Sequence, residues 1–224
     1  SNDVTIFESL AHILLGKGKD GDGLLEQAGV IEPNSGSFVK CTTPTRFNLM
    51  FKTDAGPSEK SGKEIYLRPE TAQGIFINYL LIQNSMRLKV PFGIAQTGKA
   101  FRNEIVARNF IFRTREFEQM EMQYFVNPKE DAKHVEEWKE KRFNFYLERL
   151  AIDKSHLQFH QHGESELAHY AKDAYDIQYQ FPFGWGEIEG IHNRTDFDLT
   201  QHEKLSGKNM TYFDAIENEK YHPY

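Results

Sequence analysis

The chain has 224 residues, of which 39% are hydrophobic and 13% aromatic, and its formal net charge is −6 at pH 7. This composition excludes an intrinsically disordered chain, and the length allows one domain with a sizeable core plus a small appendage. The negative charge excludes a protein that coats nucleic acid by neutralising many phosphates. Basic residues nevertheless concentrate between Arg87 and Arg115, which favours a small anionic ligand or one end of an RNA.

Cysteine content and hydropathy bear on the compartment. Cys41 is the only cysteine, so no internal disulfide can form, which fits a reducing cytoplasm. No apolar run approaches the roughly 20 residues that cross a bilayer. Ser1 and Asn2 open the chain without a charged and apolar leader. The sequence therefore predicts a cytoplasmic protein with no membrane partner.

Residues 1–45 carry little signal, and we expect them to be an N-terminal or inserted remnant. Apolar spacing predicts a helix over Val4–Leu15. The segment Gly16–Gly23 is a candidate phosphate cradle, but it lacks the G-x-x-x-x-G-K-S/T order and no strand precedes it. Its glycine and charged residues indicate a flexible loop.

The next stretch is expected to form two strands and a helix. Alternating apolar residues predict a half-buried strand at Phe47–Lys52, then a polar turn at Thr53–Lys63 and a short strand at Glu64–Arg68. A helical stripe begins after Thr71; its apolar members are Ile75, Tyr79, Ile82 and Met86. Glu70 stands where the strand meets the positive end of this helix, and the residue pattern alone favours an N-terminal cap there.

The centre of the chain predicts a long antiparallel pair. Two strand-like runs, Phe92–Ile105 and Phe112–Val126, are joined by the polar connection Val106–Ile111. Side chains alternate with period two along each run. Charged and aromatic side chains share a face on each predicted strand: Arg102 and Glu104 on the first, and Arg113, Phe117 and Glu121 on the second.

These five residues allow two interpretations. Charges on neighbouring strands can form cross-strand salt bridges in a purely structural sheet. Two guanidiniums, an aromatic ring and carboxylates facing a common space can also hold a phosphate, stack a flat base and bind an ammonium. The spacing does not separate the two readings.

The following segment predicts helix, strand and helix. Asn127 and Pro128 give a strong helix start, and the helix is expected to reach about Leu150. A short strand at Leu157–His160 precedes a second expected helix, whose stripe is Leu167, Tyr170, Ala171 and Ala174. Three histidines suggest a metal site, but their spacing matches no known ligand pattern, so surface or core roles are favoured for His160, His162 and His169.

The last predicted pair is Ile177–Phe183 and Glu187–His192, joined by a turn at Gly184–Gly186. Glu187 and Glu189 are expected to face the same side of the return strand. Adjoining strands with helices between some of them predict an α+β fold, an antiparallel β-sheet flanked by helices.

Four strings carry a resemblance to a known family. FRNE and RTREFEQME, within the predicted central pair, are similar to motif 2 of the class II aminoacyl-tRNA synthetases in the form found in glycyl-tRNA synthetase. FNLMFKT at 47–53, YLRPETAQGIF at 66–76 and FPFGWGEIEGIHNRTDFDL at 181–199 also resemble that family. The similarity covers roughly residues 46–213 in the right order, and LRPETAQG is its most discriminating string.

The resemblance implies roles for individual residues. Arg102 is expected to hold the α-phosphate of ATP, Glu104 to meet the adenine amino group, and Arg113 to reach the γ-phosphate. Phe117 is expected to stack under adenine. Glu70 and Glu121 are expected to bind the substrate ammonium from two sides.

The resemblance also implies two wider sets. The expected ATP-binding residues are Arg102, Asn103, Glu104, Phe112, Arg113, Thr114, Arg115, Glu116, Phe117, Glu187 and Ile188. The expected glycine-binding residues are Glu70, Phe117, Glu118, Gln119, Met120 and Glu121. Glu187 is the expected ligand of Mg²⁺. No structural zinc is expected, because the lone Cys41 cannot make a four-sulfur site.

The resemblance implies a glycine–tRNA ligase with glycine, ATP and tRNA(Gly) as partners, and a homodimer for the full-length parent. Residues 46–224 are expected to be an incomplete catalytic core. Motif 1 is not recognisable in residues 1–45, and motif 3 is expected just after Tyr224. The alternative is a non-catalytic relative that binds RNA or another subunit, which the joint presence of the implied site residues disfavours.

Overall fold

The computed structural model describes residues 47–57 and 62–224, and the chain divides into two compact units, residues 1–49 and 50–224. The second unit is therefore described by itself. The helix expected over Val4–Leu15 and the loop at Gly16–Gly23 lie outside the described residues.

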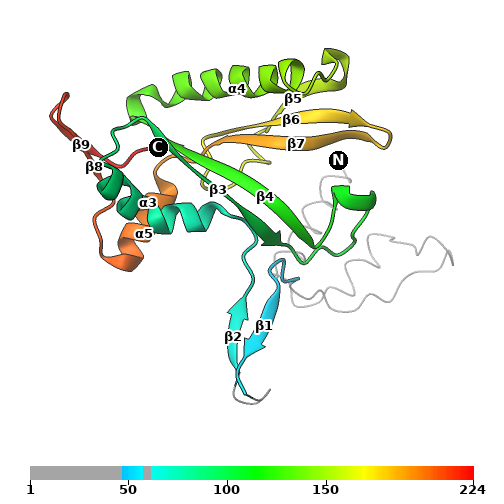
Figure 1. The fold of residues 1–224 in the computed structure, drawn as a ribbon, viewed down its shortest axis with the longest axis horizontal. Coiled ribbons are helices and arrows are strands. Elements are labelled where there is room, and N and C mark those ends of the chain that lie inside the picture. The colour runs from blue at the N-terminus through cyan, green and yellow to red at the C-terminus, as the bar shows by residue number, and fades with distance from the viewer. Residues whose placement is uncertain (1–46, 58–61) are drawn as a thin grey trace, which may run out of the picture. The chain divides into compact units, whose positions relative to one another are not determined.

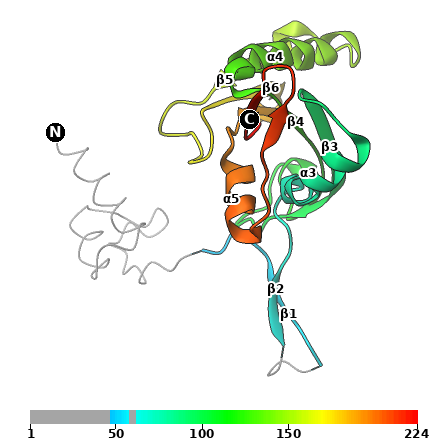
Figure 2. The ribbon, with the colours of Figure 1, turned by 90° about the vertical axis from the view of Figure 1, so that its left-hand side faces the viewer.

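The first two strands form a hairpin that extends away from the rest of the second unit (Figures 1 and 2). β1 (Lys52–Ala55) pairs antiparallel with β2 (Lys63–Tyr66), and every residue of both strands is exposed. β2 overlaps the predicted short strand, but the strand predicted at Phe47–Lys52 is wrong. A half-buried strand needs a core against its apolar side, and Phe47 and Leu49 are instead 48% and 64% exposed.

The main core lies between helix α3 (Ala72–Met86) and the antiparallel pair β3 (Phe92–Phe101) and β4 (Glu116–Phe125). The predicted helical stripe is correct where it meets the pair, because Ile75 and Tyr79 are each 1% exposed. The buried residues of this core, including two from later in the chain, are Ala72, Ile75, Phe76, Tyr79, Phe92, Ile94, Phe125, Leu199 and Met210.

Both strands of the central pair are shorter than predicted. The paired register runs from Phe92↔Phe125 to Phe101↔Glu116, and the Arg102 amide donates to the Arg115 carbonyl just beyond it. The remaining connection contains the 3₁₀ turn η1 (Phe110–Phe112). Asn109 and Phe110 adopt positive φ angles of 58° and 54°, and both lie within the predicted connection Val106–Ile111. The alternating sequence pattern therefore continues past the point where the ladder ends.

A long helix follows the central pair, as predicted. Pro128 opens the short turn η2 (Pro128–Glu130), and the Asn127 side chain accepts a hydrogen bond from the Lys129 amide before α4 (Asp131–Glu148) begins. These are the start signals that the sequence predicted.

The second sheet has the order β5-β6-β7 and is antiparallel throughout. Its strands are β5 (Leu157–Gln161), preceded by the turn η3 (Lys154–His156), then β6 (Asp173–Phe181) and β7 (Gly184–Asn193). α4 lies along these strands (Figure 1). Phe143 of α4 stacks on Phe159 at 4.8 Å between ring centroids, and Lys139 lies 3.7 Å above the Tyr175 ring.

Two local predictions in this region are wrong. Residues 162–172 form turns in place of the second predicted helix, and Ala174 is buried in β6. The His162 amide donates to the Ala174 carbonyl, which extends the sheet past the ends of its strands. The predicted turn at Gly184–Gly186 is also misplaced, because Gly184 already pairs with Phe181. The turn therefore consists of the two residues between them.

The last elements are α5 (Phe197–Ser206), β8 (Tyr212–Asp214) and β9 (Glu219–Tyr221), and α5 was not predicted. Tyr224 exchanges two backbone hydrogen bonds with Val126, of 2.9 and 3.0 Å, at the end of β4. The antiparallel sheets with packed helices confirm the predicted α+β class. No helix among the described residues is long and apolar enough to span a membrane.

Candidate active site

The inner face of β4 presents Phe117, Gln119 and Glu121 toward the start of α3. The Thr71 amide donates to Gln119 Oε1 at 3.1 Å and to Glu121 Oε2 at 2.7 Å. The Thr71 hydroxyl donates to the same Glu121 oxygen at 2.5 Å. Thr71 is fully buried, so the Glu121 carboxylate is fixed at the positive end of the helix, where a negative charge is stabilised.

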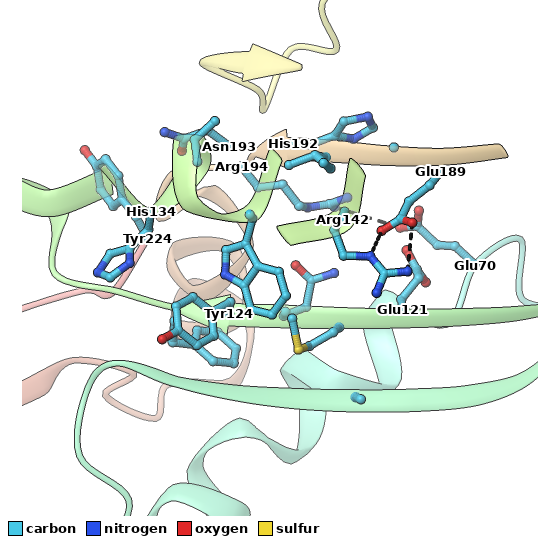
Figure 3. A pocket seen from close by; sticks show the side chains of 18 of the residues that line it. Glu70, Glu121, Tyr124, His134, Arg142, Glu189, His192, Asn193, Arg194 and Tyr224 are labelled. Carbon is cyan, nitrogen blue, oxygen red and sulfur yellow. Dashed lines mark hydrogen bonds and ion pairs between the residues drawn. The ribbon is translucent and has the colours of Figure 1, made fainter. Parts of the chain in front are cut away.

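Glu70 lies beside this carboxylate. Gln73 donates to its Oε1 at 2.5 Å, and Arg194 Nη2 lies 3.9 Å from the same oxygen. The N-cap of α3 is Thr71, so Glu70 does not take the capping role that the residue pattern favoured. Glu70 and Glu121 both line a cavity of about 840 Å³, and Figure 3 shows them at the same end of it.

Arg102 joins this group from the end of β3. Its Nε–H donates to the Pro69 carbonyl at 3.2 Å, and its guanidinium carbon lies 5.3 Å from the centroid of Phe117. Next to Arg102, the Arg68 side chain packs over Gly98. Only glycine leaves room for it, because a Cβ at this position would lie 2.2 Å from Arg68 Nη2. Arg68 in turn donates to the Lys99 carbonyl at 2.6 Å and crosses the strand next to Pro69.

Glu104 and Arg113 meet in the connection between the two strands. Arg113 Nη1 lies 3.5 Å from Glu104 Oε2, and Arg115 Nε–H donates to the Glu104 carbonyl at 3.0 Å. The predicted strand faces for Arg102, Glu104 and Arg113 are wrong, because all three lie outside β3 and β4. Their proximity comes from the fold of the connection and not from strand alternation.

Because side chains alternate along β4, the residues of the expected glycine-binding set point to two opposite faces of the strand. Glu118 and Met120 lie on the face opposite Glu121, and Met120 is 69% exposed. Glu116 shares that face and forms an ion pair with Lys99. The Thr114 hydroxyl donates to the Glu116 carbonyl at 2.8 Å. Glu118 and Met120 line the cavity together with Glu121, but their side chains lie on the face of β4 opposite Phe117 and Glu121, and Glu116 does not line it.

Glu187 and Glu189 do not share a face as predicted. The register changes between Ile177↔Glu189 and Gln178↔Glu187, which leaves Ile188 as a bulge. Loss of water around its carboxyl group and the nearby Asp176 raise the pKa of Glu187.

Glu189 turns toward α4 and lines the cavity. Arg142 donates to its two oxygens at 2.6 and 2.9 Å, and the Tyr146 hydroxyl donates at 2.8 Å (Figure 3). Burial, together with the hydrogen bond to Glu189, raises the pKa of Tyr146 to about 12. This carboxylate is therefore neutralised by α4, whereas Glu187 is not.

Phe112 connects the central pair to the second sheet. Its ring lies 5.0 Å from both Phe181 and Phe183 and packs over Gly186, where an added Cβ would approach it to 2.7 Å. This contact holds the connection that carries Glu104 and Arg113 against the β6–β7 turn.

Comparison with known families identifies the arrangement. Residues 51–220 match the model of the tRNA synthetase class II core domain (G, H, P, S and T). The chain belongs to this family.

Curated relatives of this class II core narrow the resemblance. This chain is 60% identical over 184 residues to a glycine–tRNA ligase of Treponema denticola, and the match covers 82% of this chain and 41% of the relative. This chain is also 55% identical over 201 residues to a glycine–tRNA ligase of Chlorobaculum tepidum, and the match covers 90% of this chain and 42% of that relative. The chain thus spans about two fifths of the length of these relatives, and the resemblance to glycyl-tRNA synthetases is confirmed.

A solved structure supports the fold of the class II core. A Giardia lamblia prolyl-tRNA synthetase in complex with prolyl-adenylate has a TM-score of 0.60 and 18% sequence identity, covering 79% of this chain and 34% of that one. At this identity the likeness concerns the fold.

Three histidines of this chain, His160, His162 and His192, lie together on the second sheet. His162 Nε2 lies 2.8 Å from Asp176 Oδ2, and His192 Nε2 lies 4.0 Å from Asp176 Oδ1. His160 lies 5.5 Å from the His162 ring, whereas His169 packs edge-on against Phe197. Within residues 47–57 and 62–224, no group of three or more such side chains is arranged to hold a metal ion.

Arg194 lines the cavity and was not among the site residues predicted from the sequence. It donates to both oxygens of Asp198, at 2.8 and 3.1 Å, and its side chain is 13% exposed. Burial alone would lower the pKa of Arg194, but the Asp198 hydrogen bonds and the charges of Asp198 and Glu70 raise it. Arg194 precedes α5 and Thr195 has a positive φ of 55°, so helical spacing does not account for this pair, and no local sequence pattern reports it.

Proposed function

We propose that this chain is the substrate-binding part of the catalytic core of a glycine–tRNA ligase. The full-length protein would activate glycine with ATP to glycyl-adenylate and transfer glycyl to the 3′ end of tRNA(Gly). The observation that carries the proposal is the pair Glu70 and Glu121, which line one cavity at the start of α3 beside Arg102 and Phe117. Relatives with 55–60% identity over most of this chain are glycine–tRNA ligases.

The two carboxylates suit the amino group of the substrate. An ammonium has three donors and no acceptor, and Thr71 occupies only Oε2 of Glu121. Oε1 of Glu121 and the carboxylate of Glu70 can therefore accept from two sides. Glycine offers no side chain to hold, and an added methyl group changes binding by only about 1–3 kcal/mol. Selection against alanine would then be steric: the two carboxylates fix the amine so that the α-carbon hydrogens point at protein atoms, and no space remains for a methyl group.

The neighbouring residues suit a nucleotide. Phe117 offers a ring face for adenine, Arg102 lies above that ring to hold the α-phosphate, and the Glu104 carboxylate would meet the adenine amino group. Arg113 is 46% exposed at its side chain and can extend to the γ-phosphate. Guanidinium groups match phosphate oxygens with paired hydrogen bonds.

Activation would proceed by attack of the glycine carboxylate on the α-phosphorus of ATP, with pyrophosphate as the leaving group. Neither reactant needs a covalent bond to the protein. The chain contributes alignment of the two substrates and neutralisation of the charge that develops on the phosphate oxygens. Arg102 supplies that neutralisation at the reacting phosphate.

Mg²⁺ would supply additional neutralisation of the ATP phosphates when bound. Glu187 is the residue of this chain that we assign to it. A single carboxylate fits, because Mg²⁺ is usually held by one or two carboxylates together with substrate phosphates and water. The raised pKa of Glu187 is consistent with a carboxylate that gains stability when a cation binds.

Two edge strands, one from each sheet, line the cavity. β4 and β7 are edge strands of their sheets, and both line the 840 Å³ cavity together with Tyr224 and Trp138. The Trp138 indole N–H is buried and lacks a partner among the described residues. We propose that motif 3 of the full-length protein adds a strand in this groove, next to the Tyr224–Val126 pairing. We further propose that the full-length protein is a cytoplasmic homodimer.

Substitution of Glu121 tests the proposal. Glu121→Gln keeps the shape but removes the charge, so in ATP–pyrophosphate exchange with the full-length protein the KM for glycine should rise at least roughly tenfold. The KM for ATP should stay within about twofold, since no nucleotide role is assigned to this carboxylate. Glu140→Gln, on the exposed face of α4, is the matched control and should leave both values unchanged. An equal rise in both values would defeat the role of Glu121.

The alternative of a non-catalytic RNA-binding or subunit-interaction module gives a different result. A scaffold has no use for a carboxylate pair and a phosphate-binding arginine in one cavity, and the full-length protein would show no glycine-dependent exchange. Exchange in the unaltered protein therefore excludes this alternative.

A further inference from the structure

The part of the cavity between Glu70 and Glu121, proposed above to take the substrate amine, is called the amine pocket here. Arg194 lies at its edge, next to Glu70. Two of its nitrogens are taken by Asp198, and Nη2 lies 3.9 Å from Glu70 Oε1. A guanidinium this close attracts the Glu70 carboxylate. If it moved onto Glu70, it would compete with a substrate ammonium for the same oxygens.

The face of this guanidinium is covered by Tyr170. The Arg194 guanidinium carbon lies 4.1 Å from the centroid of the Tyr170 ring, which is within the range of a cation–π interaction. Phe76 lies on another side at 5.8 Å. Tyr170 itself lines the cavity together with Glu70 and Arg194.

Tyr170 belongs to the irregular segment 162–172, which is anchored close to this ring. Lys172 donates its amide to the Asn193 carbonyl at 2.8 Å and its ammonium to Asp131 at 2.6 Å. His169 packs edge-on against Phe197 at 5.1 Å. The Tyr170 ring itself packs against His169 and Phe197, at 5.3 and 6.0 Å between ring centroids, so it is held by contacts other than the one with Arg194.

We propose that Tyr170 is a positioning residue for glycine recognition: its ring holds the Arg194 guanidinium at the edge of Glu70, so that Glu70 stays available for the substrate ammonium. This inference rests on the proposed function. Tyr170 acts through Arg194, and the property that matters is the aromatic face and not the hydroxyl group.

Three variants of the full-length protein test the proposal by ATP–pyrophosphate exchange. Tyr170→Phe keeps the aromatic face and should behave as wild type. Tyr170→Leu removes it and should raise the KM for glycine by roughly 3- to 20-fold, the range of one partly buried cation–π contact. The KM for ATP and kcat should change by less than about twofold.

Tyr175→Leu is the matched control. Tyr175 makes an equivalent contact with Lys139, at 3.7 Å, between β6 and α4, and it does not line the cavity. A loss of thermal stability is expected in both leucine variants, but the glycine KM should rise only in Tyr170→Leu. The proposal is overturned if Tyr170→Phe is as impaired as Tyr170→Leu, if glycine and ATP KM rise together, or if Tyr170→Leu is silent.

A second measurement reads the geometry without any activity. The Nε–H of Arg194 should give a sharp, slowly exchanging NMR signal in wild type and Tyr170→Phe, and a broadened one in Tyr170→Leu. An unchanged signal in Tyr170→Leu would overturn the positioning role even if the exchange assay failed. Absence of glycine-dependent exchange in the wild type would instead contradict the proposed function.

Discussion

At the scale of single residues, the fixed carboxylate of Glu121 is the main feature of the site. Its Oε2 receives both the amide and the hydroxyl of Thr71, a residue with no exposed surface. Hydrogen bonds to a charged group are stronger than those between neutral groups, and they hold its position. The carboxylate therefore needs little reorganisation when an ammonium binds.

Removing the Thr71 hydroxyl should weaken glycine binding. Thr71→Val keeps the shape and the amide donor but removes the donor to Glu121, so the glycine KM should rise several-fold. The free energy of unfolding should fall by about 1–2 kcal/mol. Thr71→Ser retains the hydroxyl and is the control. Exchange kinetics and urea unfolding of the two variants measure both effects, and identical glycine KM values in Val and Ser would contradict this role.

His162 gives the fold a pH dependence. The hydrogen bond that the His162 ring donates to the Asp176 carboxylate raises the pKa of His162 above its ordinary value of 6.5. The protonated ring is thus favoured in the folded state, and its contribution is complete below pH 6.5 and is lost as pH rises through the raised pKa. Wild-type stability should fall over that window relative to His162→Gln, as measured by denaturant unfolding at several pH values. Parallel pH profiles would rule out this linkage.

The positions of site residues were predictable where one strand carries them. Phe117 and Glu121 share a face of β4, as their period-two spacing predicts. Arg113 was assigned to the same face, but it lies before β4 in a connection whose path depends on Phe112 packing over Gly186. That contact joins segments about seventy positions apart in the sequence, and no local pattern reports it.

At the scale of elements, α4 connects the two sheets. Trp138 packs edge-on against Tyr124 of β4 at 5.2 Å, while Arg142 holds Glu189 of β7. The first residue of the helix, Asp131, accepts hydrogen bonds from Lys172 at 2.6 Å and Asn193 at 2.8 Å. Burial alone would raise the pKa of Asp131, but these bonds lower it. The helix start thus fixes the end of β7.

Truncation of Asp131 should be strongly destabilising. Asp131→Ala leaves the buried Asn193 amide and the Lys172 ammonium without their acceptor, which should lower the free energy of unfolding by about 3 kcal/mol. Glu130→Ala, one residue earlier and exposed, should change it by less than about 0.5 kcal/mol. Urea unfolding measures both, and a similar small effect for the two variants would refute the role of Asp131.

Elements with strong end signals were predicted well, and those without them were not. The Asn127–Pro128 start gave α4 almost to the residue. The helix expected around Leu167 and Tyr170 is absent, because its stripe contains small alanines and its last member, Ala174, belongs to the buried strand β6. α5 is an exception, because Asp196 at its N-cap and Gly207 at its C-cap are end signals in the sequence, although the Asp196 side chain forms no capping hydrogen bond.

At the scale of the whole molecule, the sheets β3-β4 and β5-β6-β7 each present an edge strand, β4 and β7, that pairs with no further strand among the described residues. β4 and β7 both border the groove that contains the amine pocket. Edge strands present free backbone donors and acceptors, which natural proteins cover or pair. The class of the fold was predictable from alternating strands and intervening helices, but the division of the strands among separate sheets was not, because strand order depends on contacts distant in sequence.

Calorimetric titration of the full-length protein with non-hydrolysable glycyl- and alanyl-adenylate analogues tests most directly whether Glu70 and Glu121 select glycine by its amine. The glycyl analogue should bind with one site per chain, the alanyl analogue should bind far more weakly, and Glu121→Gln should remove most of the difference. Equal binding of the two analogues, or no binding of either, would contradict the assignment of this cavity.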